Sequence, residues 1–297
     1  MHSKALNEVR SEYLEIRSSL ISNPHQLIQL ESMLTNTVSA LVLSNIVEIV
    51  RDYDAASALY PFWQNYPPLE RGRSPKGDQF PWIEVGEHAV GSKLGPLLRS
   101  EFEVEDTGFP TGSDQRFVVR SEAIREATSG ISDSAWLLMD IKSVGPRDDA
   151  DHTVMSHNQV SGSGEWAKDV DGVQNAPMMA TGNRTQHPFY PALPPLIVLP
   201  NGTVALTVTM AIKPVYKMLP EKDLRWSGQP LSRIDLITIP NGILLTQMPN
   251  YLQTYPGLLF PGKDDKGKDP RKVRARVSFK ILKEIGSWRK NTVWDGS

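Results

Sequence analysis

The sequence predicts a mixed α and β fold, with helices in the first 50 residues and strands from about residue 101 onward. Two observations support this prediction. Apolar residues near the N-terminus recur at spacings of three and four, which is the period of an amphipathic helix. Later segments are rich in β-branched and aromatic residues and are bounded by Gly, Pro and Ser clusters, which is typical of strands. A chain of 297 residues is long enough to bury a substantial core.

The helices are expected within residues 1–55. One helical face carries Leu6, Val9, Tyr13, Ile16 and Leu20, and Asn23-Pro24 ends that helix. A second apolar stripe contains Leu34, Val38, Leu41, Val42, Ile46, Val47, Ile49 and Val50. We expect these two helices to form a hairpin, which serves either for internal packing or as a subunit contact.

The strands are expected at residues 101–104, 115–120, 135–143, 196–199, 204–216, 234–238 and 273–282. A short helix is expected within 82–94, carrying Glu84 and Glu87. Residues 61–81 are punctuated by Pro and Gly and are expected to be irregular but ordered. Residues 156–192 are expected to form a long excursion with little regular structure.

Composition excludes several classes of protein. The chain has no cysteine, so it has neither disulfides nor a thiolate zinc site, which fits the cytoplasm. Its start has no secretory signal, and no segment approaches the ~20 apolar residues of a membrane helix, so no membrane is expected. Residues 261–290 hold 11 Lys and Arg against four Asp and Glu, although the net charge of the chain is −2. This basic segment indicates a polyanionic partner, or else a solvated tail.

The triplet Asp140-Ile141-Lys142, with Asp114 lying 26 positions upstream, is the main candidate for chemistry. Alternate residues of a strand point to one face, so Asp140 and Lys142 are expected on the same side, roughly 6–7 Å apart. Two carboxylates and an ammonium can hold a divalent metal and activate water beside a phosphate. An ordinary salt bridge between Asp140 and Lys142 is the alternative.

The expected C-terminal strand alternates apolar and basic residues. Val273, Ala275, Val277, Phe279 and Ile281 alternate with Lys272, Arg274, Arg276, Ser278 and Lys280. Two arginines on one strand face can each donate to the O6 and N7 atoms of a guanine. The alternative is a basic edge strand that discourages pairing with other strands.

Several segments together resemble a known family. They are PFWQNYPPLERGRSPKGDQFPWIEVGEHAVGSKL, TGSDQRF, MDIKSVGPRD, NQVSG and PGKDD, with the Arg-x-Arg pattern. These resemble the BglI family of type II restriction endonucleases, in the PD-(D/E)xK nuclease superfamily, over most of residues 50–285. The resemblance is weakest in the first 50 residues, around 98–107, between 165 and 190 and at the C-terminus. Ser113 stands where the superfamily pattern has Pro.

The resemblance implies a restriction-endonuclease-like core, with a central mixed β-sheet flanked by helices and β-rich DNA-reading extensions. It implies one endonuclease domain over residues 1–297, with a catalytic core segment at 80–145 and a basic DNA-reading segment at 255–285.

The resemblance also implies roles for single residues. Asp114 and Asp140 would be the metal-binding carboxylates, with the Ile141 carbonyl placed to contribute, and Lys142 would be the superfamily lysine. Glu87 corresponds to an acidic residue near that site. The residues matching base readers are Asp148, Lys263, Asp265, Arg274 and Arg276. The alternatives are a solvated helix residue for Glu87 and turn-forming acids for Asp148 and Asp265.

The activity implied is Mg²⁺-dependent cleavage of duplex DNA by a homodimer in the bacterial cytoplasm. The site would be an interrupted GC-rich palindrome of the GCC-spacer-GGC kind, and the ends 5′-phosphate and 3′-hydroxyl. A companion DNA methyltransferase is expected in the same system, but not as a bound partner. The alternative is a non-cleaving sequence-specific DNA-binding protein, such as a regulator or repair factor. The intact Asp/Asp/Lys set favours the nuclease, because carboxylates facing phosphate weaken binding unless a cation neutralises them.

Overall fold

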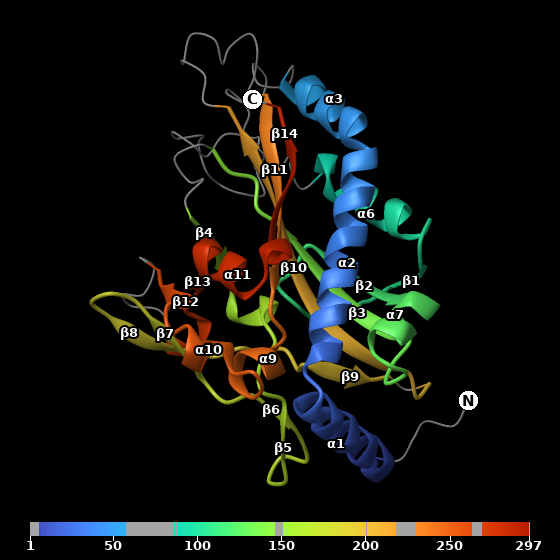
Figure 1. Ribbon diagram of the computed structural model, residues 1–297, viewed down its shortest axis with the longest axis vertical. Helices are drawn as coiled ribbons and strands as arrows, with labels where there is room; N and C mark the ends of the chain where they lie inside the picture. Colours follow the sequence, from blue (N-terminus) through green and yellow to red (C-terminus); the bar gives the residue numbers. More distant parts are fainter. Residues whose placement is uncertain are drawn as a thin grey trace.

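A seven-stranded mixed sheet lies at the centre of the computed structural model (Figure 1). The structure describes residues 6–57, 86, 88–145, 151–199, 201–217, 230–262 and 269–296. The strands are ordered β1, β2, β3, β10, β11 and β14, and β9 pairs with the start of β10. Their bounds are β1 Glu103–Asp106, β2 Gln115–Arg120, β3 Ser134–Ile141, β9 Leu196–Val198, β10 Val204–Tyr216, β11 Leu231–Ile239 and β14 Lys290–Asp295. The predicted fold class is confirmed.

β3 and β10 form the middle of this sheet and are its parallel pair, whereas the other pairings are antiparallel. Every residue of both strands is buried. Strands covered on both faces carry nearly continuous apolar runs, which is what these two sequences show. Asp140 lies opposite Ala211 and Ile141 opposite Ile212. The C-terminal end of β3 is therefore fixed against the interior of the long strand β10.

Most strand predictions agree with the structure. The predictions for 115–120 and 204–216 match β2 and β10 at both ends. Those for β1, β3, β9 and β11 differ by at most three residues at either end. The C-terminal prediction fails in part and is treated below.

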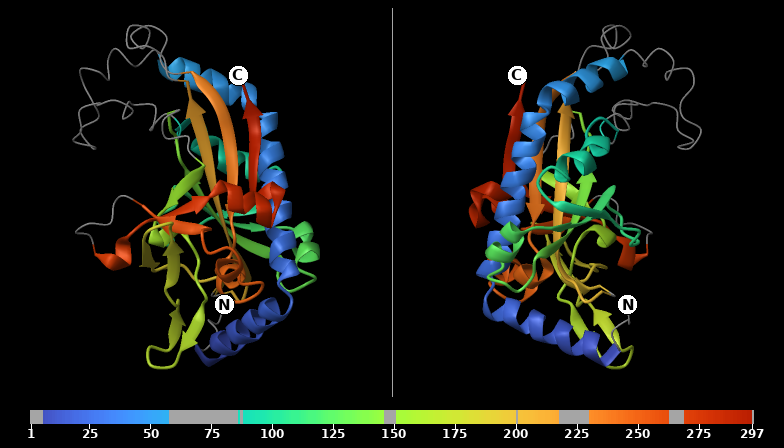
Figure 2. Two further views of the ribbon diagram at one scale, coloured as in Figure 1. Left: turned by 60° about the vertical axis from the view of Figure 1, so that its left-hand side comes forward. Right: turned by 90° about the vertical axis from the view of Figure 1, so that its right-hand side faces the viewer.

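The helix α2 covers one face of the sheet (Figure 2). The helices in the first half of the chain include α1 Leu6–Ser22, α2 His25–Ser44, α3 Ile46–Ser57, α6 Gly91–Leu98 and α7 Glu122–Ala127. Along α2, one buried stripe is formed by Leu27, Leu30, Leu34, Val38 and Val42. This stripe packs beside β11 and β14, so α2 closes the main core.

The predicted N-terminal hairpin is wrong. After Asn23-Pro24 the chain changes direction, and α1 diverges from α2 rather than lying antiparallel to it (Figures 1 and 2). α1 instead packs on β9 and α9 (Gly242–Thr246). The end of the first helix at Asn23-Pro24 was predicted correctly. The apolar pattern of α1 did not indicate which elements its apolar face packs against.

The second predicted helix is divided in two. Asn45 separates α2 from α3, and the two helices are bent by 59° at this break. Val47, assigned to the apolar stripe, is 77% exposed. No single helix in the described ranges is long and apolar enough to cross a membrane, and α2 and α3 meet the criteria of length and composition only when they are taken together as this bent pair.

A small second sheet carries the C-terminal basic segment, and it corrects the predicted strand at 273–282. Its strands are β12 Leu259–Pro261, β13 Ala275–Ser278 and β4 His152–Met155, in the order β12, β13, β4. β13 ends at Ser278, and the helix α11 (Phe279–Ile285) follows. The Ser278 hydroxyl accepts from the Ile281 N–H, which begins the helix. The apolar residues up to Phe279 are compatible with a longer strand and with a strand followed by a helix. The alternation therefore did not reveal that a helix starts at Phe279.

The excursion at 156–192 contains more regular structure than predicted. Two hairpins are formed by β5 Glu165–Ala167 with β6 Gly172–Gln174, and by β7 Met178–Thr181 with β8 Gln186–Phe189. Short helices are η2 His157–Gln159, α10 Tyr251–Thr254, η3 Pro270–Lys272 and η4 Ser287–Arg289. Residues 61–81 lie outside the described residues, and so does Glu84 in the predicted helix at 82–94.

Candidate active site

Asp140 and Lys142 lie side by side at the C-terminal end of β3. Asp140 is buried, with a side chain 2% exposed, whereas the Lys142 side chain is 30% exposed. The Lys142 Nζ lies 2.5 Å from Asp140 Oδ2. The Lys142 N–H donates to the Ile212 carbonyl at 2.8 Å, which fixes the backbone on β10. The predicted placement of both side chains on one side of the strand is confirmed.

Asp114 joins this pair from the neighbouring strand. β2 pairs antiparallel with β3 and Gln115 lies opposite Met139, so the next position of that register sets Asp114 opposite Asp140. Residues opposite each other in an antiparallel pair share a face. Asp114 Oδ2 accepts from the Ile141 N–H at 2.6 Å. Both carboxylates therefore lie at the C-terminal end of β3.

Gln159 also belongs to this site, and sequence reasoning missed it. This side chain, 3% exposed, donates from Nε2 to Asp140 Oδ1 and to the Gly112 carbonyl, the latter at 2.8 Å. Its Oε1 accepts from the Ser156 N–H at 2.8 Å. The Ser-x-x-Gln spacing is a capping box and was the available signal, but it predicts a helix start rather than a contact with Asp140.

A buried contact supports the residues just after Lys142. The Ser143 Oγ lies 3.2 Å from the Tyr53 hydroxyl oxygen, which comes from α3. Burial raises the pKa of Tyr53 above its usual value, so the phenol stays protonated. A Cβ on Gly86 would lie 2.6 Å from both the Tyr53 hydroxyl and the Ser143 Cβ. A side chain at this position would clash with both residues, so glycine lets helix α3 pack against the C-terminal end of β3.

The donor set fits a magnesium ion. Mg²⁺ prefers carboxylate, carbonyl and water oxygens and keeps several of its waters, so one or two protein carboxylates suffice. Asp114 and Asp140 supply two such carboxylates at one point. In the described part of the chain, no group of three or more His, Asp and Glu side chains could hold a metal. A water-rich magnesium site suits this pair better than a site enclosed by protein ligands.

The two arginines proposed as base readers differ in position. Arg276 lies on β13, opposite Phe260 on one side and Val154 on the other, and its side chain is half-buried. Its Nη1 donates to the Pro261 carbonyl at 3.4 Å. Arg274 is exposed and precedes the strand. Arg276 is thus the one of these two arginines that lies on β13. Lys272 and Lys280 were predicted on the same strand, but Lys272 lies on η3 and Lys280 on α11.

The small sheet is attached to the central sheet near the carboxylates. Lys213 of β10 is 2% exposed, and its Nζ donates to the His152 carbonyl of β4 at 3.3 Å. The same ammonium lies 5.1 Å from the ring centroid of Phe279. Gln159 follows β4 by four residues. β4 therefore pairs with the strand that carries Arg276, and the chain that follows β4 carries Gln159, which contacts Asp140.

Four predicted site residues lie outside the described residues. They are Glu87, Asp148, Lys263 and Asp265.

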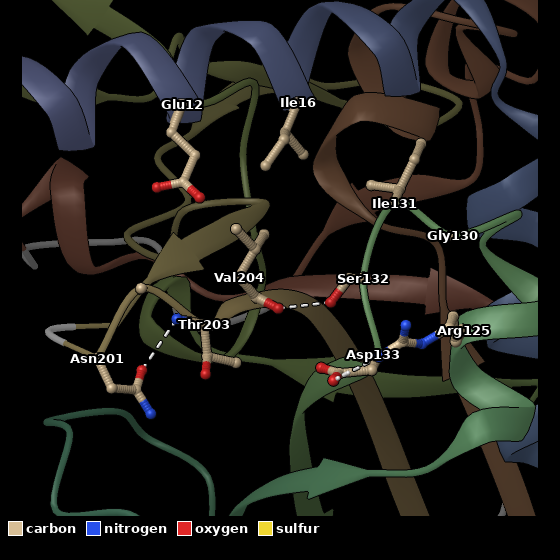
Figure 3. A pocket seen from close by; sticks show the side chains of 11 residues that line it. Glu12, Ile16, Arg125, Gly130, Ile131, Ser132, Asp133, Asn201, Thr203 and Val204 are labelled. Atoms are coloured by element: carbon tan, nitrogen blue, oxygen red, sulfur yellow. Dashed lines mark hydrogen bonds and ion pairs between the residues drawn. The ribbon is translucent and has the colours of Figure 1, made fainter.

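One cavity lies at the other end of β3 and is separate from the carboxylates. Its volume is about 390 Å³, and α1 contributes Glu12 to its lining (Figure 3). Ser132 and Val204, also in its lining, are hydrogen-bonded at 2.5 Å near the starts of β3 and β10. Arg125 and Asp133 form an ion pair at 3.3 Å. Asp114, Asp140 and Lys142 are not among the residues that line this cavity, so it is not part of the candidate site.

Comparisons with known proteins agree with this geometry. The family model described as restriction endonuclease BglI matches residues 8–293. The type II restriction enzyme BglI of Bacillus subtilis is 42% identical over 292 residues, which cover 96% of this chain and 97% of the relative.

Solved structures give the same result. The crystal structure of BglI bound to its DNA recognition sequence matches with a TM-score of 0.88 and 42% identity, covering 97% of each chain. Tetrameric SfiI bound to cognate DNA matches with a TM-score of 0.57 and 17% identity, covering 90% of this chain and 83% of that one. At that identity SfiI shows a shared fold alone. From the family match and the close relative, the chain belongs to the BglI family of type II restriction endonucleases, which are site-specific deoxyribonucleases.

Proposed function

We propose that this enzyme cuts duplex DNA by Mg²⁺-dependent hydrolysis at the end of β3, within an interrupted GC-rich palindrome of the GCC-spacer-GGC kind. The observation that carries the proposal is the meeting of three side chains at the end of β3: Asp114 accepts from the Ile141 N–H, and Asp140 and Lys142, on either side of Ile141 in the chain, form an ion pair. The products would carry 5′-phosphate and 3′-hydroxyl ends, because water is the nucleophile and no covalent intermediate is needed.

Each residue has a distinct task in this proposal. Asp114 and Asp140 would bind Mg²⁺ with the Ile141 carbonyl, and a bound Mg²⁺ supplies an acidified water and positive charge for the scissile phosphate. Restriction endonucleases generally use a divalent metal ion. The partly exposed Lys142 ammonium is accessible to a DNA phosphate, and it would hold that phosphate or the attacking water. Glu87 would hydrogen-bond a metal-bound water.

The bases would be read by the small sheet and the loops beside it. Arg274 and Arg276 would donate to guanines, and Lys263 would donate to a base acceptor. Asp148 and Asp265 would accept from cytosine N4 or orient a neighbouring cation. Support for this proposal is the basic charge of residues 261–290 together with the exposed position of Arg274.

We propose a homodimer, because a palindrome is most simply read by two subunits related by a two-fold axis. Sedimentation of the enzyme with and without cognate DNA tests this. A mass of one chain, 33.1 kDa, in both conditions would reject the dimer. We expect this enzyme in the bacterial cytoplasm, where its DNA substrate lies, with a companion methyltransferase that belongs to the same system but is not a bound partner.

The alternative of a non-cleaving DNA-binding protein finds no support, because family membership identifies a DNA-cleaving enzyme. The experiment that tests the finer proposal is digestion of a sequenced plasmid with Mg²⁺, followed by mapping of the ends. Cleavage at GCC-spacer-GGC sites with ligatable 5′-phosphates supports it. Cleavage that persists unchanged in EDTA would contradict the metal, and cuts elsewhere would contradict the recognition site.

A further inference from the structure

We propose that Gln159 is a positioning residue of the candidate active site, which orients the Asp140 carboxylate and ties it to the loop that carries Asp114. This inference rests on the proposed function, because it takes Asp140 and Asp114 as metal ligands. Gln159 itself would touch neither the metal nor the DNA.

The orientation of the Gln159 amide is fixed by its surroundings. Its Oε1 accepts from the Ser156 N–H at 2.8 Å, so Nε2 must point the other way. In that direction both acceptors are satisfied at once: Asp140 Oδ1 and the Gly112 carbonyl, the latter at 2.8 Å. Reversing the amide would set an oxygen against two oxygens and an NH₂ against an N–H. The amide therefore has one favourable orientation.

Gln159 connects the two halves of the carboxylate pair. One proton of Nε2 faces Asp140 at the end of β3, and the other faces Gly112, two residues before Asp114. A second bond reinforces the same connection, since the Gly112 N–H donates to the Asn158 carbonyl at 2.8 Å. The segment 158–159 thus holds the loop before β2 in place beside β3.

Burial makes this connection consequential. Asp140 is 2% exposed and Gln159 is 3% exposed, so water does not replace a lost bond at either atom. With Lys142 on Oδ2 and Gln159 on Oδ1, the carboxylate plane is held from both sides. Outer partners that orient metal ligands typically change metal affinity or activity about 10- to 100-fold when they are replaced.

Two variants separate a positioning role from a helix-capping role. Gln159→Glu keeps the length and an oxygen for the Ser156 N–H, and Glu is a favoured residue at this place in a capping box. It removes the donors to Asp140 and Gly112. Gln159→Met keeps the approximate volume and removes all three hydrogen bonds. Gln26→Met is the matched control, because Gln26 is a buried glutamine of α2 outside the site.

The measurements are the single-turnover cleavage rate as a function of Mg²⁺ concentration and the Kd for cognate DNA in Ca²⁺, with the melting temperature as a folding check. For Gln159→Glu and Gln159→Met we expect a rate lower by about 10- to 100-fold, or a Mg²⁺ concentration for half-maximal rate higher by that factor. The Kd for DNA should stay within about threefold of the wild type. Gln26→Met should leave both readouts unchanged.

The outcomes separate this inference from the proposed function. If Gln159→Glu cleaves with the wild-type rate and Mg²⁺ dependence while Asp140→Ala is inactive, Gln159 is only a cap and the inference fails alone. If rate and DNA affinity fall together in both variants without a change in Mg²⁺ dependence, the role is structural and the inference also fails. If Asp140→Ala itself cleaves normally, the site is misassigned and the proposed function fails. Gln159→Glu keeps the cap but adds a carboxylate beside Asp140, whereas Gln159→Met adds no charge but loses the cap, so a wild-type rate and Mg²⁺ dependence in either folded variant is enough to reject the inference.

Discussion

The Asp114 carboxylate accepts a hydrogen bond from the Ile141 N–H at 2.6 Å, although 27 positions separate the two residues. The bond joins the loop before β2 to the last residue of β3. It uses one Asp114 oxygen for the backbone and leaves the other for a different partner. Asp114 therefore combines a structural contact with its proposed role as a metal ligand, and the two can be separated by mutation.

Asp114→Asn should fold normally and lose cleavage. The amide oxygen of Asn can still accept from the Ile141 N–H, so the loop stays attached to β3. A neutral amide binds Mg²⁺ far less well than a carboxylate, because the ion favours charged oxygen ligands. Plasmid cleavage and thermal unfolding measure the two effects. Cleavage near the wild-type rate would show that Asp114 is not a metal ligand.

Lys142→Ala should abolish cleavage and leave binding of cognate DNA largely intact. The ammonium is proposed to act on the scissile phosphate or its water, which is one contact among many in the complex. Removing it also frees Asp140 Oδ2, which a bound Mg²⁺ would satisfy. Single-turnover rates with Mg²⁺ and gel-shift titrations in Ca²⁺ measure both quantities. An active Lys142→Ala enzyme would mean that the ion pair with Asp140 is structural.

The local part of the site could be predicted from the sequence, and the part created by the fold could not. Asp140 and Lys142 share a side because of strand alternation, which the sequence contains. Gln159 reaches Asp140 because η2 is folded back beside β3, and no local period encodes that return. At Ser278 the same residues fit an extended strand and a helix start, so the local pattern was ambiguous.

His152→Gln should reduce the loss of stability on acidification. Burial, and then the charges of Arg276 and Lys213, lower the pKa of His152 below the usual 6.5 of a histidine, while Asp151 opposes them. The unfolded state therefore takes up a proton near pH 6.5 that the folded state resists. Stability is complete above that pH and falls as pH decreases, until the folded His152 is protonated as well.

Urea unfolding at a series of pH values from about 8 to 5 tests the effect of His152. The free energy of unfolding should fall less steeply below pH 6.5 in His152→Gln than in the wild type. A residual slope is expected, because burial also lowers the pKa of His157. Equal slopes in both proteins would show that the pKa of His152 does not differ between the folded and unfolded states.

Arg289→Met should destabilise the enzyme strongly. Arg289 and Glu31 are both fully buried, with Nη2 and Oε2 2.7 Å apart, and Glu31 also accepts from the Asn241 N–H at 2.6 Å. Burial raises the pKa of Glu31, and Arg289 opposes that rise. Without the guanidinium, Glu31 is left as an uncompensated buried acid. The expected loss is about 3–5 kcal/mol in the free energy of unfolding.

The double variant with Glu31→Gln is the control for this pair. An uncharged Gln can still accept from the Asn241 N–H and no longer needs a cation. Adding Glu31→Gln to Arg289→Met should therefore recover much of the lost free energy of unfolding, measured by urea denaturation. No recovery would show that Arg289 acts through its packing on Trp288, whose ring centroid lies 4.3 Å from the guanidinium carbon.

Arg276→Ala and Arg274→Ala should relax the preference for a guanine and cost about 1–3 kcal/mol in binding of cognate DNA. Arg276 is held on β13 between two neighbouring strands, so its guanidinium is restrained. Lys272→Ala and Lys280→Ala remove exposed charges from η3 and α11. Each of these two changes should weaken the binding of all DNA sequences alike. Each should also reduce the slope of the logarithm of the binding constant against the logarithm of the salt concentration by about one unit, as expected for phosphate contacts.

Binding titrations on cognate and single-substituted duplexes, at several salt concentrations, distinguish the two classes. A base reader loses discrimination at one base pair while the salt slope changes little. A variant that lacks a phosphate contact has both a lower affinity and a smaller salt slope, because fewer counterions are released on binding. If both arginine variants weaken every duplex equally, β13 is a phosphate clamp and the guanines are read by other parts of the chain.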